Sequence, residues 1–175
     1  MENWATEKEF LDLWAVNYQT GEPIPAEIVE RIIAAQNYLA AYLNVRQLSF
    51  GLTDMAWHTI TEPFEGDVEQ FEVASMAPWQ VQPVVPGTAM APAFGHIFSG
   101  GYAAGYYGYK WAEVLEADAF SLFKEKGIFN REVSGSFREN ILSKGGTEHP
   151  MELYVRFRGH KPETKALIEK MGLGK

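Results

Sequence analysis

Cysteine is absent from this chain of 175 residues, which excludes structural disulfides and thiolate chemistry. Positive charge is scarce as well, because 15 Lys and Arg stand against 23 Asp and Glu, for a formal net charge of −8. Nucleic acid and membrane surfaces are therefore poor partners. No apolar run approaches the roughly 18 residues that span a bilayer, and the first residues do not resemble a signal peptide. We expect a soluble protein, in the cytoplasm or equally well in the periplasm.

The sequence motifs of several common catalytic sites are also missing. There is no H-E-x-x-H pair of zinc ligands and no G-x-S-x-G turn for a serine nucleophile, and the glycines do not have phosphate-loop spacing. Of the histidines outside the central segment, His149 and His160 lie in polar turns and are expected to be exposed. His58 extends an apolar stripe and is expected to be a hydrogen-bonded core residue. From the residues alone, the chain can grip a substrate but shows no evident catalytic machinery.

Aromatic side chains are what the chain has in quantity, at 14% of its residues with five Trp and eight Tyr. In a soluble acidic protein this content indicates a large core or a cleft that binds an organic molecule. A surplus of apolar faces is also expected if the chain is part of a longer protein.

Hydrophobic spacing predicts an all-α chain without a domain linker. The expected helices cover residues 6–18, 26–43, 45–59, 64–76, 103–126, 131–142, 151–157 and 163–171. Thr6 is expected to cap the first helix, with Glu9 completing a capping box, and Gly127 closes the fifth. Residues 77–93 carry four prolines and are expected to form an irregular connector.

The apolar stripes predict which helix faces are buried. The expected inward residues are Phe10, Leu13 and Trp14 in the first helix, Ile28, Ile32, Ala35 and Leu39 in the second, Val45, Leu48, Leu52 and Met55 in the third, and Trp111, Leu115 and Leu122 in the fifth. Asp118 falls inside the last stripe and needs a hydrogen-bonding partner there. Its expected role, like that of Glu113, is a structural ion pair.

The most informative segment is residues 94–109. Among its five glycines and four tyrosines, the residues that point to a site are His96, Gly100, Gly101, Tyr102, Gly105, Tyr106 and Tyr109. On one helix, the spacing i, i+4, i+7 would confine the three phenols to an arc of roughly 60°. Such a face can polarise an oxygen atom of a ligand. The competing interpretation is that these tyrosines are core residues whose hydroxyls are satisfied at its edge.

Residues 96–115 (HIFSGGYAAGYYGYKWAEVL) resemble the C-terminal signature of the thimet oligopeptidase family of zinc metallopeptidases. The resemblance continues through residues 18–25 (YQTGEPIP), 137–146 (FRENILSKGG) and 154–159 (YVRFRG), and so covers essentially the whole chain. Within that family, the first residues and the six-residue step from His96 to Tyr102 look most like the bacterial peptidyl-dipeptidase branch, whose members release C-terminal dipeptides.

The resemblance implies roles for the central residues. Tyr102, Tyr109 and His96 would be catalytic, with the two phenols donating hydrogen bonds to the substrate or to the oxyanion formed from it. Tyr106 and the glycines at 100, 101 and 105 would bind substrate, since a glycine-rich loop can close over it.

The resemblance also implies a zinc cofactor. The family's H-E-x-x-H motif and third ligand correspond to residues before Met1, so residues 1–175 would be a C-terminal segment of the catalytic domain. We expect this segment to hold no metal, to be inactive alone, to pair with the N-terminal portion of the same protein, and to self-associate through exposed apolar surface. The expected substrate is a short peptide. The alternative is a stand-alone helical module that binds a peptide or a partner without catalysis.

Overall fold

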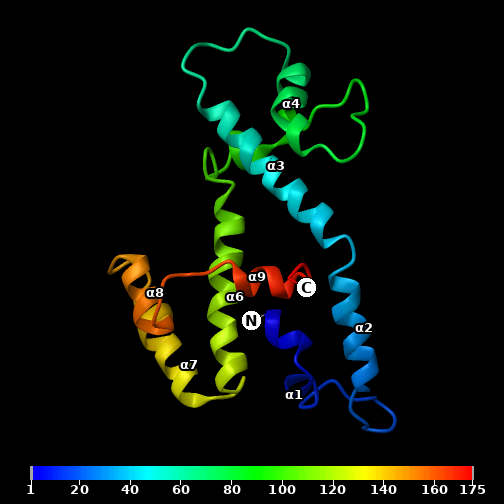
Figure 1. Cartoon of the computed structure of the whole chain (residues 1–175), viewed down its shortest axis with the longest axis vertical. Helices are drawn as coiled ribbons and strands as arrows, with labels where there is room; N and C mark the ends of the chain where they lie inside the picture. The colour runs from blue at the N-terminus through cyan, green and yellow to red at the C-terminus, as the bar shows by residue number, and fades with distance from the viewer. Residues whose placement is uncertain (1, 175) are drawn as a thin grey trace. The chain divides into compact units, whose positions relative to one another are not determined.

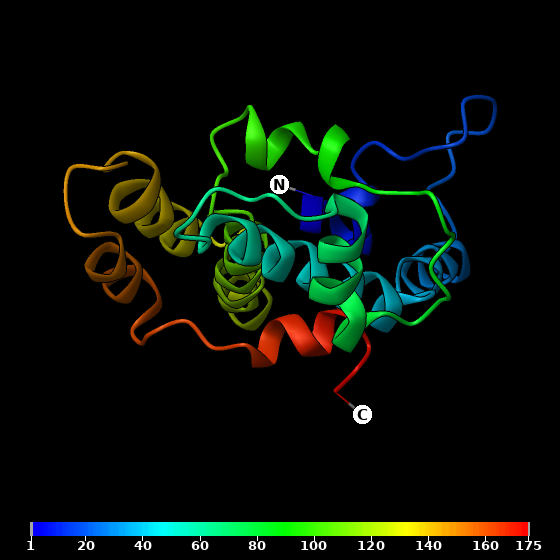
Figure 2. The ribbon, with the colours of Figure 1, turned by 90° about the horizontal axis from the view of Figure 1, so that it is seen from above.

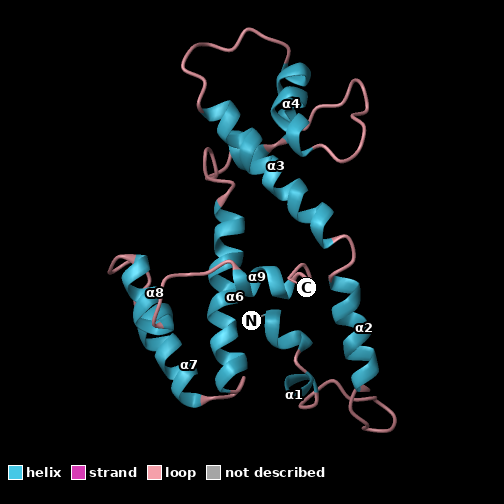
Figure 3. Cartoon of the chain, viewed as in Figure 1, coloured by secondary structure: helices cyan, strands magenta, loops and turns pink. Residues whose placement is uncertain are grey.

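The computed structural model describes residues 2–174, and over that range the chain is built from helices, turns and loops with no β-strand (Figure 3). One isolated bridge pairs Val16 with Pro23. The all-α fold expected from the sequence is therefore confirmed. None of the helices among residues 2–174 is both long and apolar enough to span a bilayer.

All α-helices except the short α5 are labelled in Figure 1 and follow one another along the chain. Their bounds are α1 (Lys8–Leu11), α2 (Ala26–Gln36), α3 (Ala40–His58), α4 (Val68–Met76), α5 (Gly95–Phe98), α6 (Gly108–Lys126), α7 (Arg131–Phe137), α8 (Pro150–Arg158) and α9 (Lys165–Lys170). Shorter helical turns are η1 (Glu2–Thr6), η2 (Ala77–Trp79), η3 (Ala91–Ala93) and the π-helical η4 (Arg138–Leu142).

These elements form two compact units. The first contains Met1–Tyr38 and Val114–Lys175, and the second contains Leu39–Glu113. Helix α6 contributes its first residues to the second unit and the rest to the first.

The first unit has an aromatic core. Trp4 packs edge-on against Phe120 and Phe123, with ring centroids 4.6 and 5.1 Å apart, and its indole N–H donates to the Ile128 carbonyl at 3.1 Å. Phe157 completes the cluster against Phe123. Interlocking rings of this kind anchor the N-terminal η1 to α6 and α8.

Asp118 finds the partners that its place in an apolar stripe requires. It is buried on α6, and its Oδ2 accepts from the Tyr154 hydroxyl at 2.6 Å. The Arg158 guanidinium lies 3.4 Å from Oδ1 and also donates to the Asp118 carbonyl at 3.0 Å. Burial, followed by the hydrogen bond to Asp118, raises the pKa of Tyr154 well above its usual value. The expected structural role of Asp118 is confirmed.

The second unit is built on α3 and α4, which pack side by side (Figure 2). The Trp57 ring contacts Phe64, Phe71 and Phe98 at centroid distances of 5.0, 4.2 and 5.8 Å. Asp67 caps α4 by accepting from the Gln70 N–H at 2.9 Å.

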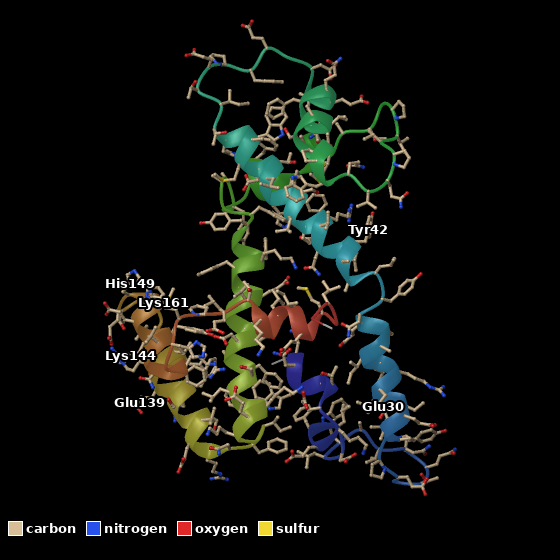
Figure 4. The ribbon with its side chains drawn as sticks, viewed as in Figure 1. Glu30, Tyr42, Glu139, Lys144, His149 and Lys161 are labelled. Carbon is tan, nitrogen blue, oxygen red and sulfur yellow. The ribbon has the colours of Figure 1, made fainter. Side chains whose placement is uncertain are left out.

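The connector at residues 77–93 is irregular, as expected, apart from the short turns η2 and η3. Its end is held by the buried Glu72 carboxylate, which accepts from the backbone N–H groups of Met90 and Ala91 at 2.7 and 2.6 Å. Between this connector, α3 and α4 lies a cavity of about 410 Å³, lined in part by Tyr42 on the first turn of α3 (Figure 4).

The structure corrects the first expected helix. Residues 6–18 do not form one helix, because η1 and the single turn α1 occupy residues 2–11 and the bridge at Val16 follows. Thr6 does not cap it, since its hydroxyl donates to the Asn3 carbonyl at 3.1 Å. After Leu11 the chain turns and pairs Val16 with Pro23, so the apolar residues at helical spacing are not carried on one helix.

The break between the second and third helices lies earlier than expected. Leu39 has φ 57°, in the left-handed region, and α3 begins at Ala40 rather than at residue 45. Neither Gly nor Pro marks this break, and the only local signal is Asn37, which is the C-cap of α2.

Several burial expectations were wrong. On α3 the apolar residues Leu48, Leu52 and Met55 are 45, 42 and 39% exposed, whereas Ser49, Thr53 and Asp54 are buried. In the first and fifth expected helices, Leu13, Trp14 and Trp111 are exposed, and Ile32 and Leu39 are exposed in the second. A stripe of apolar residues predicts a helix face that packs against another element. Within residues 2–174 these side chains stay largely exposed.

Candidate functional site

The second unit brings the predicted histidine and tyrosines together. His96 lies on α5, Tyr109 lies in the first turn of α6, and Tyr102 and Tyr106 lie in the turns between those helices. The expectation of one helix from residue 103 was wrong, because α6 begins at Gly108. The phenols therefore cluster through a folded loop and not along a helical face.

The imidazole of His96 has all three phenol rings around it. Its centroid lies 6.1 Å from the ring of Tyr102, 6.3 Å from that of Tyr106 and 6.5 Å from that of Tyr109. Tyr109 lies in turn 5.0 Å from Tyr102 and 5.2 Å from Tyr106. We call His96, Tyr102, Tyr106 and Tyr109 the tyrosine cluster.

The tyrosine cluster is open to solvent. Tyr102 and Tyr109 are 42 and 39% exposed, and His96 is exposed beside them. Tyr106 is partly buried, and its hydroxyl donates to the Gln47 side-chain oxygen at 3.0 Å. The interpretation of these tyrosines as sealed core residues does not describe Tyr102 and Tyr109, whose rings a ligand could reach.

The phenols are held in their protonated form. A hydrogen bond with Tyr102, together with burial and the neighbouring phenols, raises the pKa of Tyr109. Burial raises the pKa of Tyr106, against an opposing effect of Arg46. Since an ordinary phenol already ionises only near pH 10, both hydroxyls remain able to donate hydrogen bonds at neutral pH.

This arrangement predicts a shift in the pKa of Tyr109 when its partner is removed. In Tyr102→Phe the effect of the Tyr102 hydroxyl on Tyr109 is removed, so the pKa of Tyr109 should fall toward the ordinary value near 10. Titration of the Tyr109 ring carbon by NMR, or of absorbance at 295 nm against Tyr109→Phe, measures it. A pKa unchanged in Tyr102→Phe would contradict the hydrogen bond between the two phenols.

The residue of this loop with a left-handed backbone conformation is an alanine and not one of the predicted glycines. Ala104 has φ 51°, in the left-handed region that residues with a Cβ rarely adopt. Of the glycines predicted to bind substrate, Gly100 has no room for a Cβ, which would lie 2.9 Å from the His96 carbonyl oxygen. Gly101 and Gly105 lie in the same turn and meet no such obstruction.

Asp54 on α3 is a residue of this region that the sequence patterns did not single out. Its carboxylate accepts from the backbone N–H groups of Ala104 and Tyr106, each at 2.9 Å. Its Oδ1 also lies 2.8 Å from His58 Nδ1, so His58 is hydrogen-bonded as expected. The available signal was an acid set among apolar residues in a predicted helix, which is the same signal that Asp118 gave.

The other polar residues have structural partners. Glu113 pairs with Lys110 at 2.5 Å, which confirms its expected ion pair. His149 is exposed and caps α8 by accepting from the Met151 N–H at 3.2 Å (Figure 4). His160 is partly buried instead of exposed, and its Nδ1 lies 2.6 Å from the Lys161 carbonyl oxygen in its own turn. Among residues 2–174, no group of three or more His, Cys, Asp or Glu side chains is arranged to hold a metal ion.

Comparison with known proteins places this chain in a family. Residues 1–173 match the profile of peptidase family M3. The chain is 48% identical to oligopeptidase A of Escherichia coli K12, 39% identical to a probable cytosolic oligopeptidase A of Arabidopsis thaliana, and 36% identical to dipeptidyl carboxypeptidase of E. coli K12. These matches cover 99, 99 and 98% of this chain but only 26, 25 and 26% of the relatives.

The chain thus spans about a quarter of the length of the curated relatives that it matches. Its identity to these oligopeptidase A sequences is higher than to this dipeptidyl carboxypeptidase, so the branch expected from the first residues is not the one with the higher identity. The family expected from the tyrosine segment is confirmed by the profile match and by these relatives together. The chain belongs to peptidase family M3.

Proposed function

We propose that the longer protein containing this chain hydrolyses short peptides, and that the tyrosine cluster forms one wall of its substrate site. The observation that carries the proposal is the pair Tyr102 and Tyr109, whose rings lie 5.0 Å apart and are both substantially exposed. Two neighbouring phenol hydroxyls are suited to donate hydrogen bonds to the same oxygen atom of a ligand. Membership in a peptidase family makes a peptide carbonyl the natural acceptor.

The phenols would act where negative charge develops. When water attacks a peptide carbonyl, its oxygen becomes an oxyanion, and donors already aimed at that position stabilise it without further reorganisation. Tyr102 and Tyr109 are proposed to be those donors. In this role they remain protonated and shift no proton of their own, which agrees with the raised pKa of Tyr109.

The remaining residues of the loop would bind substrate. His96 lies beside all three phenols and offers ring nitrogens to the backbone of a bound peptide. The Tyr106 hydroxyl already donates a hydrogen bond to Gln47, so Tyr106 would contribute its aromatic ring to the wall of the site. The glycines at 100, 101 and 105 would let the substrate backbone approach the loop closely.

We propose that the reaction uses zinc held by residues outside this chain. The donor groups among residues 2–174 do not fit a zinc site, since no suitable group of three converges. No step is therefore assigned to a metal here. The proposal is supported by family membership and by the three quarters of the relatives' length that this chain does not cover.

The rest of the longer protein is also the proposed partner of the exposed apolar face of α3. Leu48, Leu52 and Met55 lie at helical spacing on that face, and each is about two fifths exposed. Covering them would remove apolar surface from water. Separated from that partner, the chain would self-associate through the same face. The proposed compartment is the cytoplasm, in keeping with the printed name of the probable cytosolic relative.

The proposal is tested by the products formed from short peptides. The longer protein should cleave peptides of about ten residues in the presence of zinc, whereas the chain of residues 1–175 alone should cleave none and bind no zinc tightly. Mass spectrometry of the products distinguishes release of C-terminal dipeptides, which stays a prediction, from internal cleavage. Hydrolysis by the separate chain would overturn the division of roles, and no hydrolysis by the longer protein would favour a binding module.

A further inference from the structure

Asp54 is a fully buried carboxylate with three donors around it. Its exposed fraction is 0%. Oδ1 accepts from the Ala104 N–H at 2.9 Å and lies 2.8 Å from His58 Nδ1, while Oδ2 accepts from the Tyr106 N–H at 2.9 Å. Both oxygens of the carboxylate are therefore used, and two of the three donors belong to the loop of the tyrosine cluster.

A buried carboxylate is a costly way to hold a helix, because removing its charge from water must be offset by strong hydrogen bonds. Helix α3 gains none of those bonds for its own packing apart from the contact with His58, four residues along the same helix. The two longest-range bonds reach across 50 and 52 residues of sequence to the loop. The carboxylate therefore anchors the loop to α3 through these two hydrogen bonds.

The loop needs such an anchor. Ala104 has φ 51°, in the left-handed region that is unfavourable for a residue with a Cβ. The N–H groups of Ala104 and Tyr106 would otherwise have to find water. Within the described residues, the neighbouring N–H groups of Ala103 and Tyr107 have no protein acceptor. Asp54 therefore fixes residues 104 and 106, whereas the other hydrogen bonds of this segment, such as that from the Gly105 N–H to the Tyr102 carbonyl at 2.9 Å, are local turn contacts.

We propose that Asp54 is a positioning residue for the tyrosine cluster. Holding residues 104 and 106 sets the direction of the chain between Tyr102 and Tyr109, and so sets the 5.0 Å approach of their rings. On the same helix as Asp54, His58 Nδ1 lies 2.8 Å from both Oδ1 and the backbone carbonyl oxygen of Asp54, and this contact helps to orient the carboxylate. The catalytic consequence rests on the proposed function, whereas the anchoring itself does not.

The anchor is tested first without any substitution. Site-resolved hydrogen exchange of the longer protein should show the amides of Ala104 and Tyr106 exchanging about tenfold or more slowly than those of Ala103 and Tyr107, because hydrogen bonds to a charged acceptor are the stronger kind. Equal exchange at all four amides would overturn the proposal.

The second test is Asp54→Asn in the longer protein. The carboxamide keeps one acceptor oxygen and turns a donor toward the other N–H, so exchange at residue 104 or 106 should become about tenfold faster. Amides of residues 117–120 in α6 should not change, which separates release of the loop from general unfolding. Peptide hydrolysis should show kcat lowered about tenfold to a hundredfold and KM changed less than about threefold.

The matched control is Asp67→Asn. Asp67 also accepts a backbone N–H at 2.9 Å in the same unit, but it caps α4 and is exposed. Its kcat should stay within about twofold of the wild type. An equal loss of kcat in both variants would overturn the assignment of Asp54.

The two proposals fail in different ways. If the loop amides are released in Asp54→Asn and kcat is unchanged while Tyr102→Phe lowers it, the positioning role is wrong and the proposed function stands. If the wild-type exchange pattern is as expected but neither variant affects hydrolysis, the proposed function fails and the anchor remains as a structural feature only. Should Asp54→Asn not fold, the wild-type exchange measurement alone decides the anchor.

Discussion

Tyr102→Phe in the longer protein is expected to lower kcat by about 10²–10³-fold while leaving KM within a few fold, the size of effect seen when one donor to a developing oxyanion is removed. The substitution takes away a single hydroxyl and keeps the ring that packs 5.0 Å from Tyr109. Steady-state kinetics on one short peptide, with protein folding checked by circular dichroism, measures the effect.

Tyr107→Phe is the matched control for that experiment. Tyr107 lies in the same loop and is 60% exposed, but its ring is not among the close aromatic pairs of the cluster. Its removal should change kcat by less than about twofold. If Tyr102→Phe instead raises KM and leaves kcat unchanged, the hydroxyl binds the substrate equally in its ground and transition states, and the oxyanion role is wrong.

Asp118→Ala is expected to destabilise the first unit by about 3–5 kcal/mol, because it removes the buried carboxylate that pairs with the Arg158 guanidinium and accepts from the Tyr154 hydroxyl. The side chains of Asp118 and Arg158 are 4 and 11% exposed, so water does not easily replace the lost partner. Urea-induced unfolding of variant and wild type under the same conditions gives the difference in free energy.

Two further variants bracket this prediction. Glu125→Ala removes an exposed carboxylate that also pairs with Arg158, at 3.2 Å, and should cost less than about 1 kcal/mol. Tyr154→Phe should cost about 1–3 kcal/mol, since Asp118 keeps Arg158. A loss in Asp118→Ala no larger than in Glu125→Ala would show that the buried network is not what holds α6 to α8.

The kinds of element could be predicted from the sequence better than their ends. Pro and Gly mark several boundaries correctly, such as the irregular connector with its four prolines and the stop at Gly127, which has φ 102°. The break at Leu39 carries neither Pro nor Gly, although Leu39 has φ 57°. Apolar periodicity indicates that a helix is favourable both before and after Leu39, but it does not locate the break between them. The expected second helix was therefore too long, at residues 26–43, and the expected third helix began too late.

Burial was the least predictable property. The stripe of Leu48, Leu52 and Met55 has the spacing of a core face, yet the buried face of α3 carries Ser49, Thr53 and Asp54. Of these three polar residues, Asp54 is buried with hydrogen bonds to the backbone of residues 104 and 106, which lie 50 and 52 residues away along the chain. No local pattern can indicate such a partner.

The tyrosine cluster was predicted for a partly incorrect reason. Helical spacing suggested that Tyr102, Tyr106 and Tyr109 share one face, but the first two lie in turns before α6. They nevertheless meet around His96, because the loop folds back onto α3 through Asp54. The family could be inferred from the sequence of residues 96–115. Asp54, the residue proposed to position the tyrosine cluster, could be identified only from the structure.

The most direct test of the account is the affinity of the longer protein for a phosphinic peptide, in which a tetrahedral phosphinate replaces the scissile amide. If Tyr102 stabilises the oxyanion, Tyr102→Phe weakens this ligand by the same factor, about 10²–10³, by which it lowers kcat/KM, while affinity for the product peptide stays unchanged. Equal affinity of wild type and Tyr102→Phe for the phosphinic peptide would contradict the account.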